Sequence, residues 1–319
     1  MLERPLGTTG LRTSTLGLGT LTWGRDTDGD DAATLLRDFV EGGGTLVDTA
    51  ASYGEGAAEE LLGELIGPVV ARDDVLLCTK AGVRRTPSGG VLDASRRTLL
   101  SGLDASLRRL GTDHIDLWLV QSPDPGTPLE ETVGALRFAL DTGRTRYVGL
   151  SNHGGWQTAR VATLLEPTHT LAAVQVEYSL LERGVEREVV PAAAALGVGV
   201  LAWSPLGRGV LTGKYRRTVP ADSRAASAHL AGFVAPYLGA SAAPVVEALV
   251  TAAEGLERSP LEVALAWLLG RPQVAAAVIG PRTPAQLAAA LAATADLPDA
   301  IVAALDEVSA PATGYPERR

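Results

Sequence analysis

Short apolar runs alternate with longer amphipathic segments along most of this 319-residue chain. Each run is rich in leucine, alanine or β-branched residues, and the segments between runs repeat their apolar residues with the period of a helix. Buried strands that alternate with helices predict a parallel sheet, and eight such strands predict a closed (β/α)8 barrel, the TIM-barrel form of the α/β class. The predicted strands cover residues 16–19, 45–47, 75–79, 115–120, 147–150, 172–176, 199–202 and 275–279.

Helices are predicted between these strands, and further elements at both ends of the chain. Turn residues at positions 7–10 predict a hairpin over residues 2–14, before the first barrel strand. Two helices, over 261–269 and 298–308, are expected outside the simple alternation. A barrel of this kind accounts for residues 1–319 as a single domain. The helices of the alternation are predicted at 31–41, 57–66, 95–110, 129–141, 156–165, 185–196 and 243–257.

Polar residues follow the apolar runs directly, at the point where each predicted strand ends. In a barrel these positions share one rim, the carboxyl face where active sites lie. Ordinary polar loop residues would explain about half of them, so the pattern predicts a functional site. The residues are Asp48, Lys80, Gln121, Ser151, Asn152, Gln175, Trp203, Ser204 and Gly280.

Asp48, Tyr53 and Lys80 form a candidate proton-donating set. Lys80 is one of only two lysines in the chain and ends an apolar run, as Asp48 does on the neighbouring one. A cationic lysine lowers the pKa of a phenol beside it, and a carboxylate holds that lysine charged and in place. We therefore predict that Lys80 brings the pKa of Tyr53 down from ~10 towards the working pH.

Composition narrows the classes of partner and compartment. The net charge of −9 and the pI near 5.1 argue against nucleic acid or an anionic membrane as a general partner. Cys78 is the only cysteine and the first residues contain no apolar signal segment, so a cytoplasmic location is expected. The histidines show no metal-ligand spacing, and no metal site is expected. Oligomeric state stays open.

Several motifs follow one another in order from the first barrel strand to the C-terminal helices. They are Leu16-Gly-Leu-Gly-Thr20, Asp48-Thr-Ala-Ala-Ser-Tyr53-Gly54, Gly149-Leu-Ser-Asn152, Gln175-Val-Glu-Tyr178, Trp203-Ser-Pro-Leu-Gly-Arg-Gly209, Leu211-Thr-Gly-Lys214 and Ile279-Gly-Pro-Arg282. In this order they resemble the motifs of the aldo-keto reductases, NADPH-dependent carbonyl reductases built on this barrel. The resemblance implies reduction of a small aldehyde or ketone, with keto-sugars and other secondary metabolites among the candidates.

The resemblance also implies a role for each residue of the predicted site. Asp48, Tyr53 and Lys80 form the catalytic set, with Tyr53 as general acid. Ser151, Asn152 and Gln175 hold the nicotinamide carboxamide, and Trp203 stacks on the nicotinamide ring. Ser204, Leu206 and Gly207 approach the pyrophosphate. Gly280 ends the last strand, and Arg282 and Gln286 lie at the adenosine end of NADP(H).

The sequence departs from the family pattern at two positions. Gln121 stands where the fourth strand usually ends in histidine, and residues 288–290 are alanines where asparagine is common. A glutamine amide can orient a carbonyl but cannot relay a proton. Three readings stay open: a carbonyl reductase with an orienting Gln121, an enzyme with altered chemistry such as C=C reduction, and an NADPH-binding regulatory or sensor protein.

Two further segments are predicted to contact the cofactor. Thr283 is a candidate helix N-cap and Pro284 suits the first helical position, so Arg282 lies at a helix start that favours anions. There Arg282 would suit the 2′-phosphate of NADP. Residues 204–242 show little helix or strand pattern and are predicted to form a loop over the cofactor that serves as a partial lid.

Overall fold

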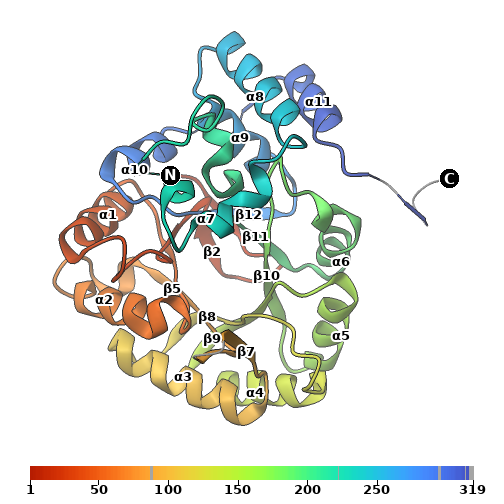
Figure 1. Ribbon diagram of the computed structural model, residues 1–319. Coiled ribbons are helices and arrows are strands. Elements are labelled where there is room, and N and C mark those ends of the chain that lie inside the picture. The colour runs from red at the N-terminus through yellow and green to blue at the C-terminus, as the bar shows by residue number, and fades with distance from the viewer. Residues whose placement is uncertain (87–88, 222, 294–295, 313, 316–319) are drawn as a thin grey trace.

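A computed structural model of the chain describes residues 1–86, 89–221, 223–293, 296–312 and 314–315. Its barrel strands are β3 (Leu16–Gly19), β4 (Leu46–Asp48), β5 (Leu76–Ala81), β8 (Ile115–Val120), β9 (Thr145–Ser151), β10 (Leu171–Glu177), β11 (Gly199–Trp203) and β12 (Val274–Ile279). All eight are parallel and close in the order β10-β11-β12-β3-β4-β5-β8-β9, inside a ring of helices (Figure 1). The predicted (β/α)8 barrel is confirmed.

The strands are apolar on both faces because each face packs against a different layer. In β8, Leu117 and Leu119 belong to the cluster inside the barrel. Trp118 and Val120, which alternate with them, belong to the larger cluster between the strands and the helices. Successive side chains of a strand point to opposite faces, so a strand covered on both sides reads as a continuous apolar run.

The helices begin and end at recognisable signals. Asp28 caps α1, its side chain accepting from the Asp31 amide, and Ser259 forms a capping box with Glu262 at the start of α9. The helices are α1 (Gly29–Glu41), α2 (Ala57–Leu65), α3 (Arg96–Leu110), α4 (Leu129–Asp141), α5 (Gly155–Leu165), α6 (Val189–Leu196), α7 (Ala231–Val234), α8 (Ala243–Gly255), α9 (Pro260–Leu269), α10 (Pro284–Leu291) and α11 (Asp299–Val308).

The assignment of the extra helices was partly wrong. α9, predicted to lie outside the alternation, packs directly on β12 and beside α10, and so covers the barrel. α8, predicted to belong to the alternation, instead packs against α9 and α11 and lies with α11 outside the ring (Figure 1). α9 is buried along its whole apolar length, from Val263 to Leu269, as expected for a helix between a strand and another helix.

The predicted N-terminal hairpin closes the amino end of the barrel. It consists of β1 (Glu3–Pro5) and β2 (Arg12–Ser14), paired antiparallel. Between them Leu6 is fully buried against the inner cluster, and Gly7 lies so close to the Gly197 carbonyl that a Cβ would not fit. Arg4 Nη1 donates to the carbonyl oxygens of Leu269 and Val274, which fixes the hairpin to the approach of β12.

Several short elements were not predicted. A second hairpin, β6 (Val83–Thr86) and β7 (Gly89–Leu92), follows β5 at the carboxyl rim. The 204–242 segment, expected to be a plain loop, contains α7 and the short 3-10 helices η4 (Gly207–Thr212), η5 (Arg224–Ala226) and η6 (Ala235–Tyr237). Earlier in the chain lie the 3-10 helices η1 (Tyr53–Gly56), η2 (Arg72–Asp74) and η3 (Gly184–Arg187). None of the helices in the described residues combines the length and hydrophobicity needed to cross a membrane.

Candidate active site

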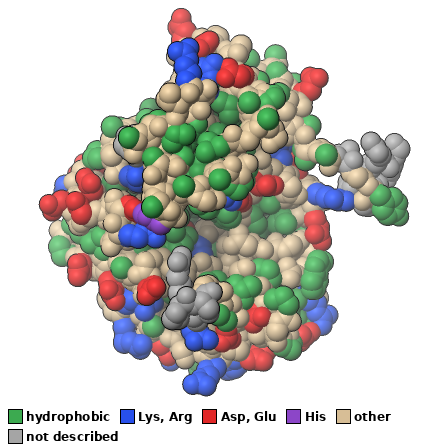
Figure 2. Space-filling view, in the orientation of Figure 1, with side chains coloured by type: hydrophobic (Ala, Val, Ile, Leu, Met, Phe, Trp, Pro, Cys, Tyr) green, Lys and Arg blue, Asp and Glu red, His purple; other side chains and the backbone are tan. Residues whose placement is uncertain are grey.

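The carboxyl ends of the strands open into a cavity of about 490 Å³. Figure 2 shows this face of the molecule hollowed near its centre. All the predicted site residues line it except Gly207, which is buried at the start of η4. Those that line it are Asp48, Tyr53, Lys80, Gln121, Ser151, Asn152, Gln175, Trp203, Ser204, Leu206, Gly280, Arg282 and Gln286. One cavity therefore unites residues from seven strand ends.

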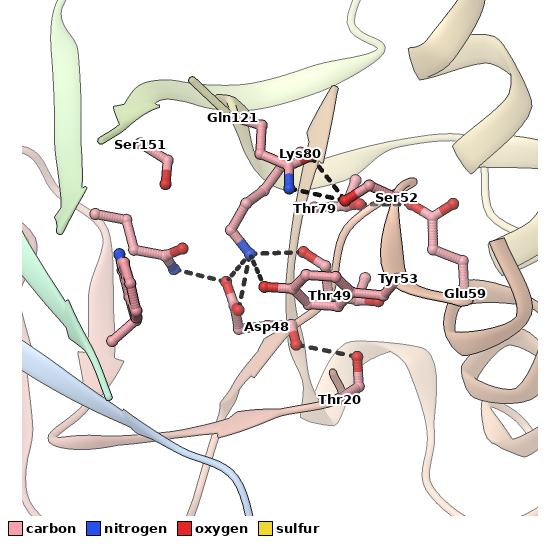
Figure 3. Close-up of polar contacts among 12 residues, drawn as sticks. Thr20, Asp48, Thr49, Ser52, Tyr53, Glu59, Thr79, Lys80, Gln121 and Ser151 are labelled. Carbon is pink, nitrogen blue, oxygen red and sulfur yellow. Dashed lines mark hydrogen bonds and ion pairs between the residues drawn. The ribbon is translucent and has the colours of Figure 1, made fainter. Parts of the chain in front are cut away.

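A buried ion pair forms the charged centre of the site. Asp48 ends β4 and Lys80 lies in the adjacent β5, and each is only 2% exposed. Lys80 Nζ is 2.8 Å from both Asp48 carboxylate oxygens and donates to the Thr49 carbonyl oxygen, also at 2.8 Å. The Tyr53 hydroxyl lies 3.5 Å from the same nitrogen (Figure 3). The ammonium group is thus fixed by three short contacts and faces the phenol.

The electrostatics of this set differ in one respect from the sequence-based prediction. Burial is the largest single influence and lowers the pKa of Lys80, but the charge of Asp48, its hydrogen bonds and the neighbouring Tyr53 and Cys78 together outweigh it, and the pKa of Lys80 lies above its ordinary value. Burial raises the pKa of Tyr53, and Lys80 only partly opposes this, so the predicted net fall in the pKa of Tyr53 is wrong for this structure. Desolvation disfavours the phenolate more than one cation at 3.5 Å favours it.

Neighbouring strands hold Asp48 and Lys80 in place. Gln175 Nε2 donates to Asp48 Oδ1 at 2.6 Å, and the Asp48 carbonyl oxygen accepts from the backbone and side chain of Thr20. Directly beside Lys80, the Thr79 hydroxyl donates to the fully buried Glu59 of α2 (Figure 3). The strands that carry Asp48 and Lys80 are therefore held both from inside the barrel mouth and from the helix layer.

Gln121 follows β8 and lines the cavity. Its Nε2 donates to the Ser52 hydroxyl at 2.7 Å, and that hydroxyl lies 3.0 Å from Gln121 Oε1 (Figure 3). Ser52 was not predicted as a site residue. Its position directly before Tyr53 was the only sequence signal that could have suggested it.

The end of β9 is connected to the end of β11 by side-chain hydrogen bonds. Asn152 Nδ2 donates to Ser151 Oγ and to the Gln121 carbonyl oxygen, and Asn152 Oδ1 accepts from the Trp203 indole at 3.0 Å. Asn152 and Ser204 both have left-handed backbone conformations, with φ of 61° and 52°. Such strain in a non-glycine residue is typical of sites where the surrounding structure dictates the backbone.

The far end of the cavity is basic. Thr283 caps α10 by accepting from the Gln286 amide, as predicted, and Arg282 precedes it. Arg224 donates to the Gly280 carbonyl oxygen at 2.7 Å and forms no ion pair with any residue that the structure describes. Burial lowers the pKa of Arg224, and the neighbouring Arg282 lowers it further. Two close, partly desolvated arginines favour an anion between them.

Arg208, Lys214, Arg224 and Phe233 line the cavity but were not predicted as site residues. All four come from the 204–242 segment, which therefore forms part of the cavity wall; its role as a partial lid stays a prediction. Arg208 and Lys214 lie inside the two family-like motifs of this segment, a signal that was present but not used. Arg224 and Phe233 have no comparable motif.

Besides the Arg224 bond to Gly280, two side-chain ion pairs attach the 204–242 segment to the barrel. Arg208 Nε and Nη2 pair with Glu177 at 2.8 and 2.6 Å, and the guanidinium lies 4.0 Å from the centre of the Phe233 ring. At the other side of the cavity, His229 Nε2 lies 2.9 Å from Asp26 in the loop after β3. The segment is anchored at both sides of the opening.

Charge in the cavity opposes the charge of the whole chain. Among the described lining residues, five are cationic (Lys80, Arg208, Lys214, Arg224 and Arg282) and only Asp48 is acidic. The chain carries a net charge of −9. Lys80 is paired with Asp48 and Arg208 with Glu177, so the local excess of positive charge lies towards the basic end, and the charges of distant exposed residues are screened by salt.

Comparison with known proteins gives a consistent result. The family model described as Aldo/keto reductase family matches residues 15–310. "Uncharacterized oxidoreductase YrpG" of Bacillus subtilis is 36% identical over 88% of this chain and 87% of its own length. "L-glyceraldehyde 3-phosphate reductase" of Escherichia coli is 33% identical over 90% and 86%. "Probable voltage-gated potassium channel subunit beta" of Oryza sativa is 32% identical over 100% and 98%.

Proposed function

Since this chain belongs to the aldo/keto reductase family, we propose that it reduces the carbonyl group of a small aldehyde or ketone with NADPH. The observation that carries the proposal is the Lys80 ammonium held between Asp48 and Tyr53 in a cavity whose other end is basic. A proton donor and an anion site in one cavity match a reaction that needs a phosphate-bearing cofactor and an acid.

The lining residues fit that cofactor. Arg282 and Arg224 suit the 2′-phosphate, because both line the same end of the cavity and two arginines close enough to repel each other are stabilised by a dianion. Gln286 also lines this end of the cavity and would contact the adenosine of the cofactor. At Gly280 a Cβ would come within 2.9 Å of the Arg224 guanidinium, so the glycine leaves room for that group beside the Gly280 carbonyl.

The remaining cofactor roles follow the order of the strand ends. Ser204, Leu206 and Gly207 would lie along the pyrophosphate, with Lys214 as a further cation. Ser151, Asn152 and Gln175 would hold the nicotinamide carboxamide, and Trp203, oriented by its bond to Asn152, would stack on the ring. When bound, NADPH supplies the hydride that reduces the carbonyl carbon.

The chain's own groups handle the proton. Tyr53 donates its hydroxyl proton to the carbonyl oxygen as that oxygen gains charge, and the Lys80 ammonium stabilises the phenolate that remains. Because the pKa of Tyr53 is raised, the phenol stays protonated and ready to donate throughout the neutral range. Gln121 can donate from Nε2 to the same carbonyl oxygen and orient it, without exchanging a proton.

The test is a steady-state assay of NADPH oxidation against a panel of aldehydes, ketones and keto-sugars. We expect turnover with at least one class of carbonyl compound. Tight binding of NADPH, detected by fluorescence quenching, together with no turnover on the whole panel would contradict the proposal and support a regulatory or sensor protein.

The sensor is retained as a second candidate because of two observations. Relatives named as potassium channel beta subunits cover the whole chain, and Gln121 occupies the position where the family resemblance leads us to expect a histidine. A third candidate, C=C reduction, is tested by offering an α,β-unsaturated ketone and identifying the product. An allylic alcohol supports carbonyl reduction, whereas a saturated ketone supports the alternative.

A further inference from the structure

Both polar atoms of the Gln121 side chain contact one hydroxyl group. Ser52 Oγ lies 2.7 Å from Gln121 Nε2 and 3.0 Å from Oε1, and Ser52 is only 8% exposed. Among the described residues, the carboxamide of Gln121 forms no other hydrogen bond that the structure shows. Ser52 is therefore the group that sets its orientation (Figure 3).

The backbone of Gln121 is fixed independently of Ser52. Its amide donates to the Ala81 carbonyl oxygen at 2.8 Å, which continues the pairing of β5 with β8. Its carbonyl oxygen accepts from Asn152 Nδ2 at 3.0 Å. Only the flexible side chain of Gln121 is left to be positioned, and it has three rotatable bonds to restrain.

A simple bracing role for Ser52 is a weaker explanation. The turn that carries Tyr53 is already held by backbone bonds, from the Tyr53 amide to Ala50 at 3.0 Å and from the Ala51 amide to Lys80 at 3.1 Å. These bonds do not involve the Ser52 hydroxyl. The hydroxyl instead has the carboxamide as its partner.

We propose that Ser52 is a positioning residue that orients the Gln121 carboxamide towards the substrate carbonyl, so that the pair together replaces the family histidine. This inference rests on the proposed carbonyl reduction. One N–H of Nε2 is used by Ser52, and the second N–H remains for the carbonyl oxygen in the cavity. A primary amide can serve both partners at once, and it stays neutral at every working pH.

The first test compares Ser52→Thr with Ser52→Val, which have the same shape and differ only in the hydroxyl. We expect Ser52→Val to lower kcat/KM about 5- to 10-fold, through loss of one orienting hydrogen bond, while Ser52→Thr retains most of the activity. The dissociation constant for NADPH should be the same in both. Equal losses in the two variants would overturn the proposal. Ser52→Ala repeats the comparison if neither branched side chain is accommodated.

A double-mutant cycle separates the two roles. If Ser52 acts through Gln121, then Ser52→Val should have almost no effect in a Gln121→Ala background. If Ser52 only braces the turn of Tyr53, the loss caused by Ser52→Val should be the same in both backgrounds. That result would contradict the inference.

A measurement without turnover distinguishes failure of this inference from failure of the proposed function. The side-chain amide signals of Gln121, assigned by their absence in Gln121→Ala, can be followed by nuclear magnetic resonance. We expect them to shift and exchange faster with water in Ser52→Val than in Ser52→Thr. Unchanged signals would overturn the inference, even if the protein proved to reduce no carbonyl compound.

Discussion

The two ends of the barrel are built from the same eight strands and have opposite properties. At the amino end, Leu6 of the hairpin is fully buried against Leu46, Leu117 and Leu201, and the interior is apolar. At the carboxyl end, the strands open into a cavity with a buried ion pair and four arginine or lysine side chains beyond it. The amino end is a packed apolar core, whereas the carboxyl end supplies charged groups and hydrogen-bond donors.

The difference shows how a barrel separates stability from chemistry. A buried charge is costly unless it is paired and hydrogen-bonded. Lys80 meets this requirement because Asp48 and the Thr49 carbonyl come from the next strand and its extension. No such requirement exists at the amino end, where Leu6 only has to fill space. Substitutions at the two ends should therefore affect different quantities.

The largest effect is expected at the carboxyl end, from Tyr53→Phe. Removing the hydroxyl should lower kcat for carbonyl reduction by about 10²- to 10⁴-fold, because no other lining group is placed to donate the proton. Thermal stability should change little, since the ring remains. Steady-state kinetics and a melting curve check both statements. Retention of most of the activity would show that the proton comes from another source.

Leu6→Ala, at the amino end, should lower the stability of the protein and leave its turnover unchanged. A fully buried leucine replaced by alanine costs about 2–5 kcal/mol of the free energy of unfolding. The value of kcat at 25 °C should stay at the wild-type level, because the hairpin lies at the barrel end away from the cavity. Urea unfolding and kinetics on the same sample test this. A drop in kcat without loss of stability would contradict the view that the amino end contributes to stability and not to chemistry.

Arg282→Ala should produce a smaller effect, confined to the cofactor. A charge-assisted contact with the 2′-phosphate contributes about 1.5–3 kcal/mol, so the dissociation constant for NADPH should rise roughly 10- to 100-fold. The constant for NADH should change much less. Arg97→Ala, an exposed arginine of α3, is the matched control for loss of one positive charge. Equal losses for both cofactors in Arg282→Ala would exclude the assignment to the 2′-phosphate.

The fold could be predicted because its signals are local. Buried strands and amphipathic helices each carry their own periodicity, and the strand ends then place polar residues on one rim. The exchange of roles between α8 and α9 could not be predicted, because both are apolar and only packing decides which one covers β12. The β6–β7 hairpin was missed because its strands are only four residues long, β7 is exposed, and neither sequence alternates.

The limits of the site prediction have a similar cause. Asp48, Lys80 and Gln121 end apolar strands and could be recognised along the chain. Ser52 and Arg224 act through partners 69 and 56 residues away, and nothing in their own neighbourhood indicates that contact. The direction of the pKa of Tyr53 was missed because desolvation depends on the packed environment, which a sequence does not display.

The smallest effect concerns Gln121 and the pH profile. With carbonyl substrates, wild-type kcat/KM should be flat between about pH 6 and pH 9. Gln121 carries no titrating group in that range, and the raised pKa of Tyr53 keeps the phenol protonated to above its ordinary value of ~10. Lys80 stays charged over the same range, because its pKa is also raised.

Gln121→His should add an inflection near the imidazole pKa of ~6.5 and change kcat/KM by less than about tenfold, with the dissociation constant for NADPH unchanged. An inflection in the wild-type profile near neutral pH would show that another group at the carboxyl end titrates during reduction. Identical flat profiles for wild type and Gln121→His, with identical rates on C=O and C=C substrates, would show that this position has no influence on the chemistry.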